Sequence, residues 1–369
     1  MKNRIFFTVT NDLTYDQRMI RICGSLAAAG YSVRLIGRKQ ASSIPLLPRD
    51  FQQVRLPCFF QKGISFYAEY NIRLFFYLLF HTADIYCAID LDTILPNLLV
   101  SRIKGKQRVY DAHEYFTEVP EVVRRPTVKR FWEKIAHWSI PQFKHCYTVA
   151  SELGHLMTEA YGPIFKVIRN VPVPSERVTR PQLDQIFTLL YQGVLNEGRG
   201  LEVAIKAMKE LPGAQLWLAG EGDLSAALRS LVKQENLEGQ VHFLGYLRPA
   251  ALREITLQAH LGLNLLENKG LSYYYSLANK AFDYIQAGLP SVHMNFPAYL
   301  GLQHQYDVFC LLEELSVDAL VSSVKYLQED KSRYQQLQQN CLSARTKLNW
   351  KQEEKILLSF YQDLFDTNH

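Results

Sequence analysis

Residues 5–37 read Ile-Phe-Phe-Thr-Val-Thr-Asn-Asp-Leu-Thr-Tyr-Asp-Gln-Arg-Met-Ile-Arg-Ile-Cys-Gly-Ser-Leu-Ala-Ala-Ala-Gly-Tyr-Ser-Val-Arg-Leu-Ile-Gly. The apolar run Ile5–Val9 predicts a buried strand, and the helical spacing of apolar residues predicts a helix over Asp16–Ala29. Gly30 ends that helix, and Tyr31–Gly37 predicts a second strand. A strand, helix and strand of this length predict a parallel sheet with right-handed crossovers, which makes the protein α/β.

The same alternation continues along the chain in two successive groups. We expect further helices over Phe66–Phe80, Leu91–Lys104, Thr127–Ser139, Ser151–Tyr161, Gly200–Met208, Leu224–Glu235 and Ala278–Ala287. Prolines in the stretch from Asn170 to Pro181 exclude a continuous helix and predict a hinge between the groups. The expected fold is two Rossmann-like domains, 1–170 and 171–349, facing a central cleft. A closing helix, 350–366, is assigned to the first domain.

Composition is that of a globular protein. The 369 residues are 48% hydrophobic and 21% charged, and the net charge of +5 is small for this length. We therefore expect anionic small molecules as partners and no nucleic acid. The six cysteines form no C-x-x-C pair, so we expect neither a metal site nor a redox motif. No apolar run approaches the ~20 residues that a membrane span needs, and we expect a cytoplasmic protein.

Two glycine-rich loops follow expected strands in the second group. The first, residues 192–200, contains Gly193 and Arg199, and its backbone N–H groups and fixed cation suit a diphosphate. The second, residues 218–222, contains Gly220, which permits close backbone approach. Each loop has a plain structural alternative. Residues 192–200 could be a flexible loop with a solvated arginine, and residues 218–222 an ordinary turn between strand and helix.

The stretch Ser276–Pro290 points most directly to a binding site. A helix that begins near Ala278 directs free N–H groups toward an anion, and Lys280 adds a charge at the same end. Asn279 lies in that first turn. Asp283 lies one turn further on and could accept hydrogen bonds from ribose hydroxyls.

The chain resembles the bacterial GT-B glycosyltransferases of glycosyltransferase family 4 over essentially its whole length. The resemblance is carried by an ordered set of motifs: Tyr15–Arg18, Asp111–Glu114, Ile168–Pro172, Gly193 with Arg199-Gly200, Leu218–Asp223, Val241–Gly245, Asn279–Pro290 and the helix at Trp350. It implies an acceptor domain followed by a domain that binds a nucleotide-sugar donor. It also implies a retaining, metal-independent hexosyltransferase without a cofactor, which uses the nucleotide-sugar as substrate.

The resemblance also assigns roles on the donor side. Arg199 and Lys280 hold the diphosphate and Asp283 binds the ribose. Two positions depart from the family pattern. Val194 stands where a first cation is usual, and Tyr275 stands where a carboxylate usually recognises the sugar. Glu267 is a candidate replacement, although its spacing does not match.

In the first domain the resemblance implies that His113 lies beside the donor sugar and is not a general base. Glu114 is either a group on the acceptor side or a surface charge. His113 has the alternative of capping a strand end. Asp16 and Arg18 are placed on the acceptor side, although Asp16 has the simpler alternative of a helix cap.

The expected acceptor is a glycan or lipid-linked molecule of cell-surface polysaccharide synthesis. The aromatic stretch Phe66–Phe80 and the basic, aromatic stretch Arg124–Trp132 suggest a peripheral contact with the inner membrane face. The structural alternatives are a core helix for the first stretch and a solvated basic face for the second. Other functions stay open: a nucleotide-sugar epimerase, or a degenerate homologue that binds without catalysis. A dehydrogenase is disfavoured, because no G-x-G-x-x-G follows the first strand.

Overall fold

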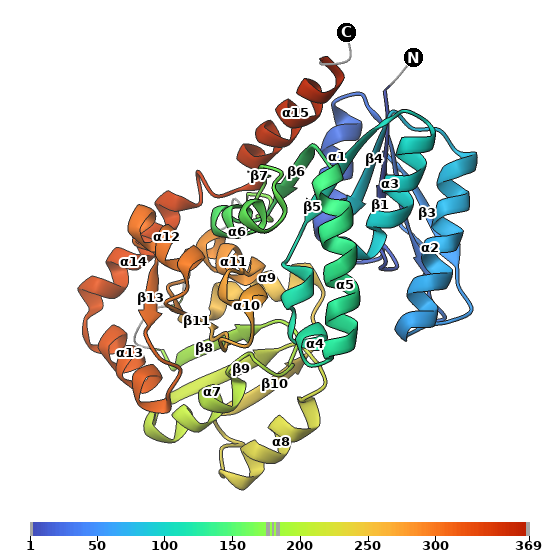
Figure 1. The fold of residues 1–369 in the computed structure, drawn as a ribbon. Coiled ribbons are helices and arrows are strands. Elements are labelled where there is room, and N and C mark those ends of the chain that lie inside the picture. The colour runs from blue at the N-terminus through green and yellow to red at the C-terminus, as the bar shows by residue number, and fades with distance from the viewer. Residues whose placement is uncertain (1–2, 175–177, 179–180, 182–184, 367–369) are drawn as a thin grey trace. The chain divides into compact units, whose positions relative to one another are not determined.

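The computed structural model describes residues 3–174, 178, 181 and 185–366 (Figure 1). Contacts divide the chain into two compact units, Met1–Asn170 with Glu353–His369, and Val171–Gln352. The two units are called unit 1 and unit 2 below. Residues 175–177 and 179–180 of the stretch expected to form the hinge lie outside the described residues.

Unit 1 contains a parallel seven-stranded sheet in the order β3-β2-β1-β4-β5-β6-β7. Its strands are β1 Arg4–Thr8, β2 Ser32–Lys39, β3 Gln52–Pro57, β4 Ile85–Ile89, β5 Gln107–Ala112, β6 His145–Thr148 and β7 Phe165–Val167. The register pairs Ile5 with Val33 of β2 and with Ile85 of β4. The order reverses direction at β1, so the carboxyl ends of β1, β4 and β5 border the place where ligands bind in such sheets.

Helices cover both faces of this sheet. They are α1 Gln17–Ala28, α2 Gly63–Phe80, α3 Ile94–Ile103, α4 Pro120–Val123, α5 Pro126–Ser139, α6 Ser151–Tyr161 and the part of α15 (Trp350–Asp366) from Glu353 on, with short 3-10 turns η1 Leu91–Thr93, η2 Phe116–Glu118 and η3 Ile140–Gln142. Successive residues of a strand point to opposite faces. Phe6 accordingly packs in the cluster under α2, whereas Phe7 meets Tyr361 of α15 at 5.9 Å between ring centroids. The C-terminal helix therefore completes the core of unit 1.

Unit 2 contains a parallel six-stranded sheet in the order β10-β9-β8-β11-β12-β13. Its strands are β8 Phe187–Gln192, β9 Ala214–Ala219, β10 Val241–Gly245, β11 Leu261–Asn264, β12 Ser291–Met294 and β13 Phe309–Leu312. Its helices are α7 Leu201–Ala207, α8 Ser225–Gln234, α9 Pro249–Gln258, α10 Leu271–Tyr274, α11 Asn279–Ala287, α12 Pro297–Tyr306, α13 Val317–Glu329 and α14 Lys331–Ala344, with the turn η4 Met208–Glu210. The order reverses at β8, so the carboxyl ends of β8 and β11 border the binding edge of this sheet.

The two parallel α/β sheets confirm the predicted fold class, and most predicted elements agree with the structure to within a few residues. The sequence pattern missed α4, α9, α10 and everything from α12 through α14, including the edge strand β13. In α14 the buried residues Tyr334, Leu337, Cys341 and Ala344 form a narrow stripe on an otherwise polar helix. Such a helix gives a weak periodic signal, because tertiary packing and not composition makes it stable.

The described part of the chain contains neither a membrane-spanning helix nor a group of side chains that could hold a metal ion. No helix in the described part of the chain is long and apolar enough to cross a membrane. Among the same residues, no three His, Cys, Asp or Glu side chains are grouped so that they could hold a metal ion.

Candidate functional site

In unit 1 the strand ends bring acidic residues around His113. His113 directly follows β5, and Asp90 directly follows β4. The backbone N–H of His113 donates to Asp90 Oδ1 at 2.8 Å. Asp90 has φ 56°, a left-handed conformation that few non-glycine residues adopt. Asp111 lies near the carboxyl end of β5, and its Oδ2 is 3.1 Å from His113 Nε2. The predicted residue His113 therefore lies between two carboxylates at the binding edge of the sheet.

Arg18 is the buried cation of this group. Its side chain is 2% exposed and donates from Nη2 to Asp111 Oδ1 at 2.9 Å. Its Nε donates to His113 Nε2 at 2.8 Å, and Nη1 donates to the backbone carbonyl of Ile168 at 3.1 Å. Arg18, which was predicted to lie on the acceptor side, is thus held by hydrogen bonds inside unit 1 and contacts the His113 ring.

Opposing charges set the protonation of these groups. Burial disfavours the ionised Asp111 carboxyl, but the Arg18 guanidinium and His113 outweigh burial and lower its pKa. Burial lowers the pKa of His113, and the carboxylates of Asp111 and Asp90 more than reverse this effect, so that the His113 pKa is raised.

Asp92, in the same region, was not singled out from the sequence. Its side chain accepts a hydrogen bond from Thr10 Oγ1 at 2.6 Å and lies buried. Burial, followed by the charge of Asp90, raises the pKa of Asp92 to about 7. Glu114 is exposed and has no side-chain hydrogen bond within the described residues. Desolvation by the surrounding protein, followed by the charge of Asp90, raises the pKa of Glu114 to about 8.

Asp16 has the structural role of a helix cap. Its Oδ1 accepts from the backbone N–H of Met19 at 3.0 Å, which satisfies one of the free donors at the start of α1. Asn11 Nδ2 binds the other carboxylate oxygen of Asp16 at 2.6 Å. Both oxygens of Asp16 are therefore used within its own loop, so capping is its role in the structure.

In unit 2 the two glycine-rich loops pack directly on each other. A Cβ atom on Gly220 would lie 1.9 Å from the carbonyl oxygen of Gly193, and both glycines have positive φ, 151° and 136°. The backbone N–H of Gly193 donates to Ala219 O at 2.9 Å. The ends of β8 and β9 are thereby held together, and a side chain at position 220 would separate them.

Arg199 and Lys280 meet at this point, and both lie on aromatic rings. The Arg199 guanidinium carbon lies 4.7 Å from the centroid of the Tyr273 ring, and Lys280 Nζ lies 3.8 Å from that of Tyr191. Among the described residues neither side chain has a hydrogen-bond acceptor, and Arg199 Nε is buried without one. Burial, together with the charge of Arg199, lowers the pKa of Lys280 well below its ordinary value. Two neighbouring cations without acceptors form a site that suits an anion.

The helix α11 begins beside these cations. Its N-cap residue, Ala278, donates its N–H to Tyr299 Oη at 3.0 Å and has no capping side chain. The next N–H groups, of Asn279 and Lys280, have no intrahelical acceptor and add a partial positive charge. Backbone donors and two side-chain cations thus meet at the carboxyl end of β8.

Asp283 lies one turn into α11, next to the end of β8. Gln192 Nε2 donates to Asp283 Oδ2 at 2.9 Å, and Gln192 Oε1 accepts from Thr256 Oγ1 at 2.9 Å. This chain of hydrogen bonds orients the carboxylate. Thr256 was not identified from the sequence, because α9 itself was not predicted, and residue 192 was named only as the start of a glycine-rich loop.

Val194 and Tyr275 are the positions that depart from the pattern of the resembled family. Val194 is 54% exposed, and its carbonyl accepts from Tyr191 Oη at 2.8 Å. Tyr275 is half-buried with its ring against Tyr274. Glu267 forms an ion pair with Lys269 at 2.6 Å, and Lys269 also binds Glu197. The carboxylate of Glu267 is therefore neutralised by Lys269.

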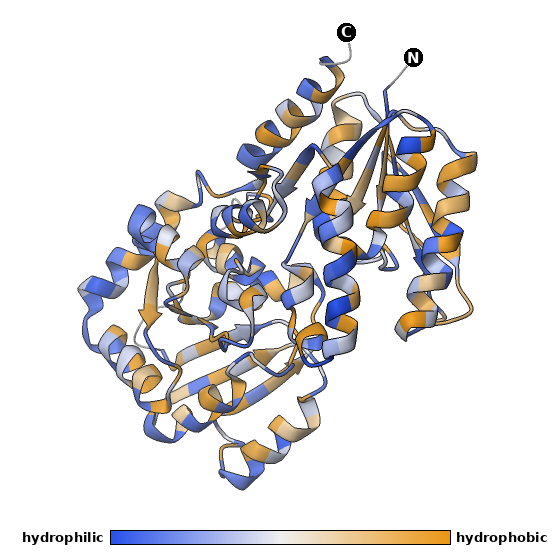
Figure 2. Cartoon of the chain, viewed as in Figure 1, coloured by the Kyte–Doolittle hydropathy of each residue, from blue (hydrophilic) through white to orange (hydrophobic). Residues whose placement is uncertain are grey.

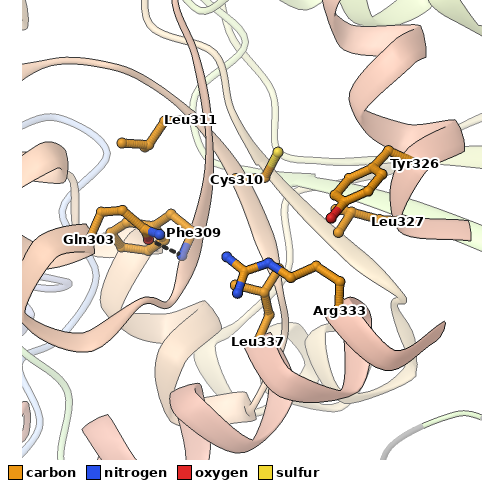
Figure 3. Close-up of a pocket in the computed structure, with 8 residues that line it drawn as sticks. All are labelled: Gln303, Phe309, Cys310, Leu311, Tyr326, Leu327, Arg333 and Leu337. Atoms are coloured by element: carbon orange, nitrogen blue, oxygen red, sulfur yellow. Dashed lines mark hydrogen bonds between the residues drawn. The ribbon is translucent and has the colours of Figure 1, made fainter. Parts of the chain in front are cut away.

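A hollow elsewhere in unit 2 contains none of the predicted site residues. It lies beside the edge strand β13, and Figure 3 shows Cys310, Tyr326 and Arg333 in its lining. Arg333 is occupied by Asp307, to which it donates two hydrogen bonds of 2.6 and 2.7 Å. The cations without acceptors are at the carboxyl end of β8, so we place the candidate anion site there.

Comparison with solved structures defines the fold. Sucrose-phosphate synthase from Thermosynechococcus elongatus superposes with a TM-score of 0.82 at 15% identity, over 99% of this chain and 100% of that one. Anabaena HepE in complex with UDP-glucose gives 0.76 at 13% identity, over 98% and 99%. WaaG, a glycosyltransferase involved in lipopolysaccharide biosynthesis, gives 0.74 at 16% identity, over 96% and 98%. The chain has the GT-B fold of glycosyltransferases.

Sequence comparison finds a family that resembles unit 2. Residues 179–342 match the model described as glycosyl transferases group 1. The matched residues all lie within unit 2, so unit 2 is similar to this family. The comparison with curated protein sequences gives no match.

Proposed function

We propose that the protein is a glycosyltransferase that takes its sugar from a nucleoside diphosphate sugar bound to unit 2. The observation that carries the proposal is that Arg199 and Lys280 have no acceptor among the described residues, beside the free N–H groups of α11. A diphosphate would supply oxygen acceptors for both cations and for the helix N-terminus. Asp283, oriented by Gln192, would accept hydrogen bonds from the ribose.

Nucleotide binding tests this proposal directly. We expect UDP, GDP, ADP or TDP to bind in calorimetry, and the Arg199→Ala variant to bind about ten- to a hundredfold more weakly, because charge-assisted hydrogen bonds contribute about 1.5–3 kcal/mol. Lys206→Ala removes an exposed cation from α7 and serves as the matched control. Equal affinity of wild type and Arg199→Ala would contradict the assigned role of Arg199. No binding of any of the four nucleotides would favour a degenerate homologue.

A uridine nucleotide is the first donor to test, since the solved structures of Anabaena HepE contain UDP or UDP-glucose. We propose a hexose as the sugar, and a glycan or lipid-linked acceptor of cell-surface polysaccharide synthesis. Hydrolysis of UDP-, GDP-, ADP- and TDP-sugars, measured with and without acceptor, identifies the donor. Conversion of the sugar without any acceptor would indicate an epimerase instead.

We propose that transfer retains the anomeric configuration and needs no metal ion. In this mechanism the donor phosphate removes the proton of the acceptor hydroxyl on the face that the leaving group occupies. His113 contributes a polar contact to the sugar and no proton transfer. NMR of the product reports its anomeric configuration, and an inverted product would contradict the mechanism. Loss of activity with a chelator and recovery with Mg²⁺ or Mn²⁺ would contradict the metal-free part.

We further propose that unit 1 binds an anionic membrane surface in the cytoplasm. Helices α2, α3 and α5 lie side by side, and Figure 2 shows hydrophobic residues recurring along α2 and α3. Large apolar side chains are exposed on all three: Ile72, Phe76, Phe80, Leu99, Ile103, Phe131 and Trp138. We call this surface the α2–α3–α5 face. Exposed apolar groups on neighbouring helices suit the boundary between lipid headgroups and acyl chains.

Charge on the α2–α3–α5 face supports an anionic lipid as the partner. Its exposed charged residues are Arg102, Arg130 and Lys134, whereas the two glutamates of these helices, Glu69 and Glu133, each lie near a cation of their own helix. We expect binding to vesicles that contain phosphatidylglycerol and little binding to neutral vesicles. The double variant Phe76→Ser, Phe80→Ser should lose binding, and Leu47→Ser, at another exposed position of unit 1, serves as control. Equal binding of both variants would contradict this surface.

A further inference from the structure

Arg18 makes a three-way contact that determines how His113 can hydrogen-bond. Its guanidinium reaches Asp111 Oδ1, His113 Nε2 and the carbonyl of Ile168, at 2.9, 2.8 and 3.1 Å. Arginine is permanently protonated and has donors only. The contact from Arg18 Nε therefore requires a lone pair on His113 Nε2.

The position of the ring proton follows from this requirement. A neutral imidazole has one N–H, so a lone pair on Nε2 places the hydrogen on Nδ1. Nδ1 faces Asp90 Oδ2 at 3.6 Å, which is too long for a hydrogen bond. The Nδ1–H group is thus left to donate to a ligand, and the His113 side chain is 24% exposed.

The charged groups around His113 come from several elements. Asp111 is part of β5, Asp90 directly follows β4, and Arg18 is part of α1. The centroid of the Tyr147 ring, in β6, lies 5.9 Å from the guanidinium carbon of Arg18. A doubly protonated ring would set Nε2–H against the Arg18 Nε–H and could donate to Asp111 Oδ2 instead, 3.1 Å away. Protonation of His113 therefore requires Arg18 to give up one of its three contacts.

Arg18 also ties this arrangement to the last residues of unit 1. Ile168 precedes Arg169, whose N–H and guanidinium both bind Glu353 at the start of the α15 segment of unit 1, at 2.9 and 3.2 Å. One turn after Arg18 in α1, Arg21 donates to Asn170 Oδ1 at 2.5 Å. Both places where the chain leaves unit 1 are therefore connected by hydrogen bonds, and Arg18 joins one of them to His113.

We propose that Arg18 is a positioning residue that holds His113 as the Nδ1–H tautomer, so that the ring offers its ligand a hydrogen-bond donor and no free basic nitrogen. The sugar as that ligand rests on the proposed function. In this role His113 recognises a hydroxyl oxygen and is unable to act as a general base, since its single lone pair is engaged by Arg18.

Nitrogen-15 NMR of histidine-labelled protein without substrate tests the tautomer. We assign the His113 signals by their loss in His113→Gln and read them on the alkaline plateau of the titration. In wild type we expect Nδ1 to show the shift of a protonated ring nitrogen and Nε2 that of an unprotonated one. In Arg18→Lys, whose single ammonium lacks the guanidinium fork, we expect the Nε2–H form to gain population. A wild-type Nε2–H tautomer would overturn the proposal.

A second variant and a control make the result independent of folding defects. Arg18→Met removes a charge that lowers the His113 pKa. The midpoint of the His113 titration should therefore rise by about one pH unit or more. Arg21→Lys, one turn away on α1, should change neither tautomer nor midpoint. An unchanged midpoint in folded Arg18→Met would contradict the proposal. Because these measurements use no donor or acceptor, absent transferase activity would refute the proposed function without affecting the tautomer result.

Discussion

Lys280 Nζ lies over the Tyr191 ring, 3.8 Å from its centroid, and also approaches Gly193, where an added Cβ would be 3.4 Å from it. A buried ammonium without an anionic acceptor is unfavourable in the folded protein, and the cation–π contact offsets part of this cost. The site therefore favours a bound anion. Replacement of Lys280 should weaken anion binding, and it should leave the stability of the protein without nucleotide unchanged or higher.

The first prediction concerns Lys280→Met. This variant should bind UDP more weakly, by about tenfold or more, because one cation of the site is lost. Without nucleotide it should be as stable as wild type or more stable, since it no longer buries an unpaired charge. Calorimetry and urea unfolding measure the two effects. Weaker stability together with unchanged binding would show that Lys280 has a purely structural role.

The second prediction is the pH dependence that Lys280 causes. Its pKa is lowered in the folded protein, so the unfolded chain binds more protons in the window below the ordinary value of 10.5. The free energy of unfolding should then rise with pH through that window. Lys280→Met should show a smaller rise in urea unfolding. Parallel pH curves for the two proteins would argue against a lowered pKa.

The third prediction concerns Asp92, whose pKa is raised to about 7 against an ordinary value of 3.8. The folded protein binds the additional proton between these values, so its stability should fall as pH rises from about 4 to 7. Asp92→Asn removes this dependence and keeps the Thr10 contact possible. Urea unfolding at pH 5 and pH 8 should therefore show a variant that gains stability relative to wild type at the higher pH.

Asp84→Asn is the matched contrast to Asp92→Asn. Backbone and side-chain hydrogen bonds lower the Asp84 pKa despite partial burial, so its contribution to stability is present above the ordinary pKa and is lost as pH falls. The Asn variant at position 84 should lose stability at pH 8 relative to wild type. The same sign for both variants would contradict the two assigned environments.

The fourth prediction concerns the approach of the two glycine-rich loops. Gly220→Ala would place a Cβ 1.9 Å from Gly193 O at a φ of 151°, so we expect a loss of more than about 2 kcal/mol in unfolding free energy. Gly24→Ala, inside α1 with nothing within 4 Å of its Cβ, should gain about 0.5–1 kcal/mol. Chemical denaturation compares the two. A tolerated Gly220→Ala would mean that the loops can separate at little cost.

The fifth prediction separates the ribose contact from the diphosphate contact. Asp283→Ala should weaken UDP binding by about tenfold, because two hydroxyl hydrogen bonds are lost, and should leave the affinity for pyrophosphate nearly unchanged. Arg199→Ala should weaken both ligands. Calorimetry with UDP and pyrophosphate on both variants tests the assignment. An equal loss for both ligands in Asp283→Ala would place Asp283 near the phosphates instead.

Local patterns predicted the order of strands and helices well where each element has a strong apolar face. The helix Ser151–Tyr161 was predicted with the bounds that the structure has. From Pro297 to Ala344 the prediction failed, because α12, β13 and α14 are short or largely polar and are stable through contacts with the rest of unit 2. Thr256, which binds Gln192, was missed because its helix α9 was not predicted.

By itself the sequence determined a parallel α/β architecture in two units and a group of candidate donor residues, because strand and helix periodicities and glycine-rich loops are local properties of the chain. Tertiary structure alone decided which charges are neutralised. Arg18 is bound to Asp111 and His113, and Glu267 to Lys269, whereas Arg199 and Lys280 have no described acceptor. Whether a charge is paired depends on residues distant in sequence that meet only on folding, so no local pattern could reveal it.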